Sequence, residues 1–205
     1  MLKSRFNTEY ISVKIGIVFS KLGISPNIWT LFALIPALGG FAALLHGELL
    51  YGFILFFISG FIDAIDGAVA RVTGSVTAKG AFLDGIIDRY VEILLYMGLL
   101  FYLLDKDAEF LSIHSSVWVT LLIFGAMMPS FVTAYADHRK VVTKAQEHRR
   151  MAGFLERAER LILLYVGMIL GYFNDPWLVY MIVLTGLLAN ITAIQRIWFV
   201  LKFRE

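Results

Sequence analysis

Long apolar stretches recur along this chain of 205 residues and restrict it to helices that cross a lipid bilayer. A helix needs roughly 20 apolar residues to span the hydrocarbon core. Hydrophobic residues make up 59% of the sequence, which is above the share in ordinary soluble domains. We therefore predict an all-α integral membrane protein with six transmembrane helices, at residues 27–46, 49–70, 82–104, 115–137, 156–173 and 176–200.

The N-terminal segment differs from these spans, because Lys14 interrupts its apolar run. Ile11 and Ile15 recur there at helical spacing, which predicts an amphipathic helix lying in the membrane interface. A disordered tail is the alternative, and a cleaved signal peptide is not expected. The predicted domains are a juxtamembrane amphipathic helix at residues 1–23 and a six-helix domain at residues 24–205.

Basic residues accumulate before the first predicted span and in every second connection after it, within residues 71–79 and 139–157. They also follow the last span, within residues 202–204. Lysine and arginine are enriched on the cytoplasmic side of membrane proteins. We therefore expect a multi-pass protein of the cell membrane with both termini and the active site on the cytoplasmic side.

Four aspartates lie at the ends of two neighbouring apolar spans. Asp63 and Asp66 end the second span, and Asp84 and Asp88 begin the third. A spacing of three or four residues places each pair on one helix face, so the two faces can oppose each other. Ionisable groups within membrane helices are expensive to bury and are functional by default.

Carboxylate oxygens are the ligands that magnesium, manganese and calcium prefer, and four of them can serve two ions. The chain has no cysteine, which excludes a thiolate metal site. The aspartates could instead form a network of salt bridges with Arg71, Lys79 and Arg89. They would also suit a cation or proton transporter, which would place its acids near mid-membrane, or a scaffold with a structural metal.

The stretch that holds the aspartates reads D-x2-D-G-x2-A-R-x8-G-x3-D-x3-D, with every fixed position filled. This pattern resembles the signature of the CDP-alcohol phosphotransferases. Eight fixed residues at fixed offsets make a chance match improbable. The fixed positions are Asp63, Asp66, Gly67, Ala70, Arg71, Gly80, Asp84 and Asp88.

The resemblance implies that an acceptor hydroxyl attacks the β-phosphorus of a CDP-linked lipid and releases CMP. It implies magnesium or manganese as cofactor, two ions per active site, with Asp63, Asp66 and Asp84 as metal ligands. Asp88 is similar to the catalytic base of the family and is also a candidate ligand of the second metal. The resemblance further implies a homodimer among membrane lipids, and no nucleic-acid partner is expected.

The resemblance also implies a set of residues around the cytidine diphosphate. The residues after Ser25 match a Pro-Asn-x-x-Thr pattern of the family, while a helix N-cap role for Ser25 and Asn27 stays open. The CDP-binding candidates are Asn27, Thr30, Asp63, Asp66, Gly67, Ala70, Arg71, Gly80 and Asp84.

A second basic group suggests the acceptor. The segment E-R-A-E-R at residues 156–160, with Arg139 before it and Arg196 after it, resembles the members that use inositol 1-phosphate. These are the phosphatidylinositol phosphate and archaetidylinositol phosphate synthases. Arg139, Arg157 and Arg196 would bind the acceptor's phosphate, and snorkelling surface charge is the alternative. Asp137 stands where that subgroup carries a basic residue, so glycerol 3-phosphate or another polar alcohol stays open as the acceptor.

Overall fold

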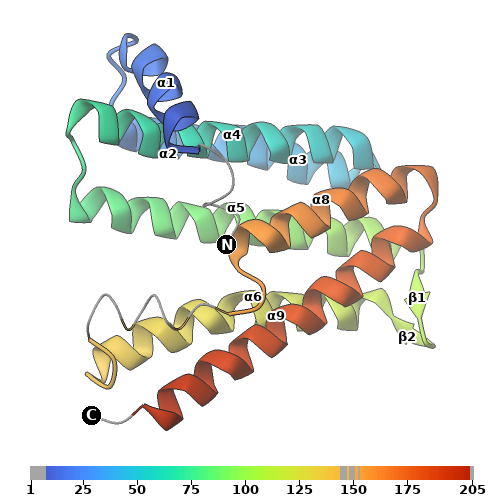
Figure 1. Cartoon of the computed structure of the whole chain (residues 1–205). Coiled ribbons are helices and arrows are strands. Elements are labelled where there is room, and N and C mark those ends of the chain that lie inside the picture. The colour runs from blue at the N-terminus through green and yellow to red at the C-terminus, as the bar shows by residue number, and fades with distance from the viewer. Residues whose placement is uncertain (1–7, 144–146, 148–150, 152, 204–205) are drawn as a thin grey trace. The chain divides into compact units, whose positions relative to one another are not determined.

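The computed structural model describes residues 8–143, 147, 151 and 153–203. The chain divides into two compact units, residues 1–98 and 99–205, and each unit is described by itself. Figure 1 shows a protein built almost entirely of helices. Its elements are α1 (Thr8–Ser20), α2 (Pro26–Phe32), α3 (Leu34–Leu45), α4 (Leu49–Thr73), α5 (Ala78–Asp105), β1 (Glu109–Phe110), β2 (Ile113–His114), α6 (Ser115–His138), α8 (Arg157–Phe173) and α9 (Pro176–Lys202).

Four stretches among the described residues are long and apolar enough to cross a membrane, namely Pro26–Leu45, α4, α6 and α9. The prediction of a helical membrane protein is confirmed at this level. Helix α5 carries charged residues through its first half, up to Glu92, and α8 has only 17 residues. The count of six spans therefore stays a prediction.

Large apolar side chains point outward from all four of these stretches. Ile35, Phe57, Phe131 and Ile194 are each more than half exposed. Soluble monomers rarely present wide apolar surfaces to water, whereas lipid chains accept them. The exposed surface is therefore that of a protein surrounded by lipid.

The first predicted span forms two helices, α2 and α3, which meet at Ala33. Pro36 has no backbone N–H, so it cannot donate to the carbonyl of Phe32 as the helix would require. The Ser59 hydroxyl of α4 donates to the Ala33 carbonyl at 2.8 Å. The break at Ala33 therefore lies in the turn before the proline, and a side chain of the neighbouring helix bonds to the backbone at the break.

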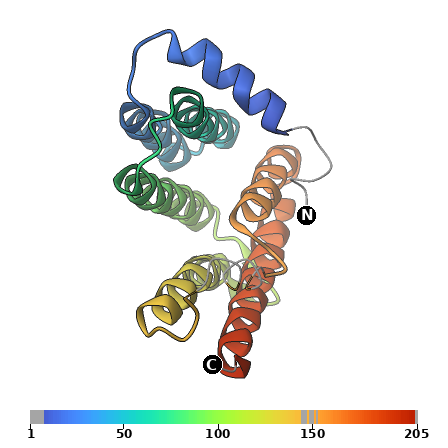
Figure 2. The same cartoon turned by 60° about the vertical axis from the view of Figure 1, so that its left-hand side comes forward.

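Within residues 8–98, α1, α2 and α3 each pack against α4. Figure 2 shows α1 crossing α3 and α4, which are seen nearly end-on. Trp29, Ile65 and Val69 form the buried core where α2 meets α4, and Phe19 of α1 packs against it. The Phe19 and Trp29 rings meet edge to face, with centroids 5.4 Å apart. Helix α1 lies within the predicted N-terminal segment. Its amphipathic character and its position in the membrane interface stay predictions, and residues 1–7 lie outside the described part.

Within residues 99–205, α6 and α8 both pack against α9. Asn190 of α9 donates its side-chain amide to the Leu121 carbonyl of α6 at 2.9 Å. A Cβ atom at Gly125 would lie 2.4 Å from that amide nitrogen, so the glycine permits the close crossing of the two helices. The short hairpin of β1 and β2 lies between α5 and α6 in the chain and was not predicted.

Candidate active site

Three of the four motif aspartates come together in the first unit. Asp63 and Asp66 lie near the end of α4, and Asp84 lies in the second turn of α5. Gly74 ends α4 in the left-handed conformation, with a φ of 67°, and this turn leads the chain toward α5. One carboxylate oxygen from each aspartate lies within 4.8 Å of the others. The sequence therefore identified residues that the fold does assemble.

Asp66 is the most enclosed of the three, with 6% of its surface exposed. The Thr30 hydroxyl of α2 donates to its carboxylate oxygen Oδ2. The Pro26 carbonyl lies 3.2 Å from the same hydroxyl and is the weaker competitor for its single proton. Thr30, which the sequence assigns to the nucleotide, thus orients a carboxylate of the cluster.

Asp88 lies one turn beyond Asp84 on α5 and is half-buried. Among the described residues, the group of mutually close acidic oxygens contains the other three aspartates and does not include Asp88. Its oxygen Oδ1 is shielded from solvent. Asp88 therefore lies outside the group of three clustered carboxylates.

Arg71 lies two turns from Asp63 along α4 and reaches the N-terminal helix. Its Nη2 atom donates to the Ser12 hydroxyl of α1 at 2.7 Å. A Cβ atom added to Gly67 would lie 3.3 Å from Arg71 Nη1, so the guanidinium folds back over the glycine. Ala70, between them, is half-buried. The small residues of the motif leave room here for a charged side chain.

The start of α5 meets the start of α2. A Cβ atom at Gly80 would lie 3.1 Å from Thr77 Oγ1 and 3.2 Å from Asn27 Oδ1. Thr77 Oγ1 also accepts from the Gly80 backbone N–H at 3.0 Å. Ser25 stands at the N-cap of α2 without a side-chain capping bond. Asn27 and Gly80, both predicted to contact the nucleotide, are thus neighbours.

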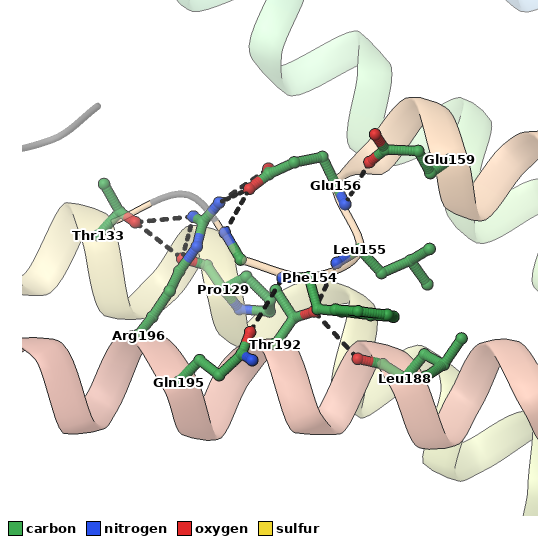
Figure 3. A network of polar contacts seen from close by, with 11 residues as sticks. Pro129, Thr133, Phe154, Leu155, Glu156, Glu159, Leu188, Thr192, Gln195 and Arg196 are labelled. Carbon is green, nitrogen blue, oxygen red and sulfur yellow. Dashed lines mark hydrogen bonds and ion pairs between the residues drawn. The ribbon is translucent and has the colours of Figure 1, made fainter. Parts of the chain in front are cut away.

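The second predicted group lies in the second unit, where Arg196 is its best-defined member (Figure 3). Arg196 Nη2 donates to both carboxylate oxygens of Glu156 at 2.8 Å. Its Nη1 atom donates to the Pro129 carbonyl and to the Thr133 hydroxyl, each at 2.9 Å. Arg157 begins α8 and is half-buried, and Arg139 is exposed at the end of α6.

Residues 23–198 match the family model of the CDP-alcohol phosphatidyltransferases. The chain belongs to the CDP-alcohol phosphatidyltransferase family. It is accordingly an enzyme of this class, which removes the interpretations as a transporter or a scaffold.

Several curated relatives in the family are similar over most of their length. The archaetidylinositol phosphate synthase of Pyrococcus horikoshii is 33% identical over 188 residues, which cover 90% of this chain and 88% of that protein. The phosphatidylinositol phosphate synthase of Mycobacteroides abscessus is 30% identical over 181 residues, which cover 86% of this chain and 76% of that protein.

A solved structure shares the fold of this phosphatidyltransferase. The crystal structure of Mycobacterium tuberculosis phosphatidylinositol phosphate synthase with CDP-DAG bound has a TM-score of 0.78 and 24% identity, and covers 94% of both chains. A second crystal structure of that synthase is a complex with manganese and citrate. The carboxylate cluster of the present chain fits a hard divalent cation, because it offers three oxygen ligands at one point.

Two features of this phosphatidyltransferase were missed from the sequence. Glu92 is 2% exposed, and its carboxylate accepts from Arg89 Nη1 at 2.7 Å and from the Tyr96 hydroxyl at 2.6 Å. Its spacing of four after Asp88 was a usable signal. Gly16 of α1 was also missed, although a Cβ there would lie 2.5 Å from the Ala68 carbonyl of α4.

Proposed function

We propose that this enzyme transfers a phosphatidyl-type group from a CDP-linked lipid to a hydroxyl of inositol 1-phosphate, with release of CMP. The observation that carries the proposal is the convergence of Asp63, Asp66 and Asp84 within the family's motif. The named synthases among its relatives support an inositol phosphate as the acceptor. The lipid part is diacylglycerol or archaeol, which only apolar helix faces would contact.

Asp63, Asp66 and Asp84 would hold divalent ions, magnesium or manganese, with two ions per active site and Asp88 as a further ligand of the second. Such ions would neutralise the diphosphate and stabilise the CMP that leaves. Thr30 contributes by fixing one oxygen of Asp66, which keeps that carboxylate oriented.

The diphosphate is placed by residues around this cluster. Arg71 can turn its guanidinium from Ser12 to a phosphate oxygen, since both Arg71 and the surface around it are exposed. Gly67 and Ala70 are small, so a bulky ligand could approach α4 closely once Arg71 turns away from Gly67. Gly80 has the same role on α5, where it leaves room for Asn27. These residues, with the three clustered aspartates, form the proposed CDP site.

Asp88 acts as the general base. As the acceptor's hydroxyl oxygen forms a bond to the β-phosphorus, the bond from that phosphorus to the CMP oxygen breaks. The electron pair of the broken bond leaves with CMP, and the hydroxyl proton passes to the Asp88 carboxylate. A carboxylate next to the three clustered oxygens but outside their group suits this role.

Arg139, Arg157 and Arg196 would bind the acceptor's phosphate. A guanidinium group offers paired donors that match phosphate oxygens, and the three arginines come from α6, α8 and α9 or from their ends. We further propose six membrane spans, both termini and the active site on the cytoplasmic side, and a homodimer. The basic residues in alternate connections support this orientation.

The test is an assay of CMP release by the purified enzyme in lipid nanodiscs. The acceptors are inositol 1-phosphate, glycerol 3-phosphate, serine and inositol, each offered with CDP-diacylglycerol or CDP-archaeol and with or without Mg²⁺. We expect rapid release only with inositol 1-phosphate and Mg²⁺. Faster release with glycerol 3-phosphate would overturn the acceptor assignment, and release without any divalent ion would overturn the metal assignment.

A further inference from the structure

Arg196 binds a carboxylate of its own chain where an arginine of an acceptor site would bind a phosphate. Both oxygens of Glu156 accept from Arg196 Nη2 (Figure 3). The Gly153 backbone N–H donates to Glu156 Oε1 at 2.8 Å. The carboxylate thus receives a guanidinium and a backbone amide, which are the donors that also bind phosphate oxygens.

The two partners of this ion pair are held to different degrees. The Arg196 side chain is 14% exposed, and the Pro129 carbonyl and Thr133 hydroxyl of α6 fix its other nitrogen. The Glu156 side chain is 44% exposed. Glu156 is therefore the partner that can leave. Its rotation into solvent would give up the bonds from the Gly153 N–H and from the Glu159 backbone N–H, the latter as part of a capping box at the start of α8. Arg196 would keep its bonds to α6.

Besides the bond from the Gly153 N–H to this carboxylate, two hydrogen bonds to α9 hold the loop before α8. The Phe154 backbone N–H donates to Gln195 Oε1, and the Leu155 N–H donates to Thr192 Oγ1, each at 2.9 Å. Both acceptors lie on α9, as Figure 3 shows. If the Glu156 side chain left Arg196, these two bonds would still hold the loop on α9.

We infer that Glu156 is an internal competitor for the acceptor's phosphate. Its carboxylate neutralises Arg196 while the acceptor is absent, and the phosphate displaces it on binding. A phosphate monoester carries a charge of about −1.5 to −2 at pH 7, so it outcompetes a single carboxylate for the guanidinium. Glu156 thereby raises the acceptor concentration that the enzyme needs. This inference rests on the proposed role of Arg196.

The test compares Glu156→Gln with Glu159→Gln. The Glu159 carboxylate accepts from the Glu156 backbone N–H at 2.7 Å, as the other half of the same helix cap. Glutamine keeps the shape at residue 156 but loses the charge that holds Arg196. We expect Glu156→Gln to lower the KM for inositol 1-phosphate by about 3- to 10-fold. Glu159→Gln should leave this KM unchanged.

We expect Arg196→Ala to raise the acceptor KM. The inference is overturned if Glu156→Gln raises it too, because Glu156 would then position the arginine. A second measurement does not depend on the acceptor's identity. Inorganic phosphate should stabilise Glu156→Gln against thermal unfolding at concentrations about 3- to 10-fold lower than it stabilises the wild type. Equal concentrations would overturn the inference. An incorrect acceptor would instead appear as absent CMP release by the wild type with inositol 1-phosphate.

Discussion

Thr30 of α2 donates its hydroxyl to the carboxylate of Asp66 on α4. The bond joins the first apolar stretch to the second at the buried member of the aspartate cluster. It stabilises the ionised carboxylate in one orientation, as a metal ligand requires.

Thr30→Val should therefore weaken the binding of divalent cations. Valine keeps the shape of threonine but cannot donate, so Asp66 loses a hydrogen bond to a charged group. We expect the Kd for Mn²⁺, measured by isothermal titration, to rise about 10-fold. Thr30→Ser retains the hydroxyl and should bind Mn²⁺ as the wild type does. Equal affinity in all three proteins would show that the bond does not support the metal site.

Asp88→Asn separates base chemistry from ligand binding. A positioned base contributes about 10²- to 10⁴-fold to a rate, so CMP release should fall by that factor. CDP binding in the presence of Mg²⁺ should persist, because Asp63, Asp66 and Asp84 are unchanged. Asp63→Asn is the comparison variant and should lose both properties. Undiminished turnover in Asp88→Asn would exclude Asp88 as the base.

Gly16→Leu should separate α1 from α4. A Cβ atom at Gly16 would lie 2.5 Å from the Ala68 backbone carbonyl, which cannot move aside as a side-chain end can. The Ser12 bond to Arg71 would then be lost, and we expect the KM for the CDP-lipid to rise several-fold. Gly39→Ala is the control, since a Cβ there meets only Leu55 at an ordinary 3.4 Å. An unchanged KM in Gly16→Leu would mean that α1 does not support the CDP site.

The aspartate cluster was predictable because its spacing encodes a helix face, and two such faces had to meet across one turn. Three other contacts were not predictable, because each joins elements distant in sequence. They are those of Ser12 with Arg71, of Gly16 with Ala68 and of Glu156 with Arg196. Arg89 shows a different limit, because more than one acidic side chain lay within its reach. Its charge allowed a bond to the aspartates, and the fold gives it a bond to Glu92 on its own helix. The break at Ala33 depends on Pro36, which a count of apolar residues does not register.

The buried bonds of Glu92 lead to a prediction about the stability of the fold. Its buried carboxylate binds both Arg89 and Tyr96, so Glu92→Leu would leave the arginine without this partner. We expect the free energy of unfolding to fall by about 2–4 kcal/mol. The double variant Arg89→Leu/Glu92→Leu removes both charges and should recover most of this loss. Chemical denaturation in detergent micelles measures both, and a double variant less stable than Glu92→Leu would contradict this reading of the pair.

The central claim is that the clustered carboxylates bind a cytidine nucleotide through divalent ions. The most direct measurement is the Kd of CDP for the wild type and for Asp66→Asn, each with Mg²⁺ and with EDTA. We predict that chelation weakens CDP binding to the wild type by about 100-fold or more, as expected when the charge of a bound metal is lost. Asp66→Asn should bind CDP weakly in both conditions. Equal affinity of the wild type with Mg²⁺ and with EDTA would contradict the account.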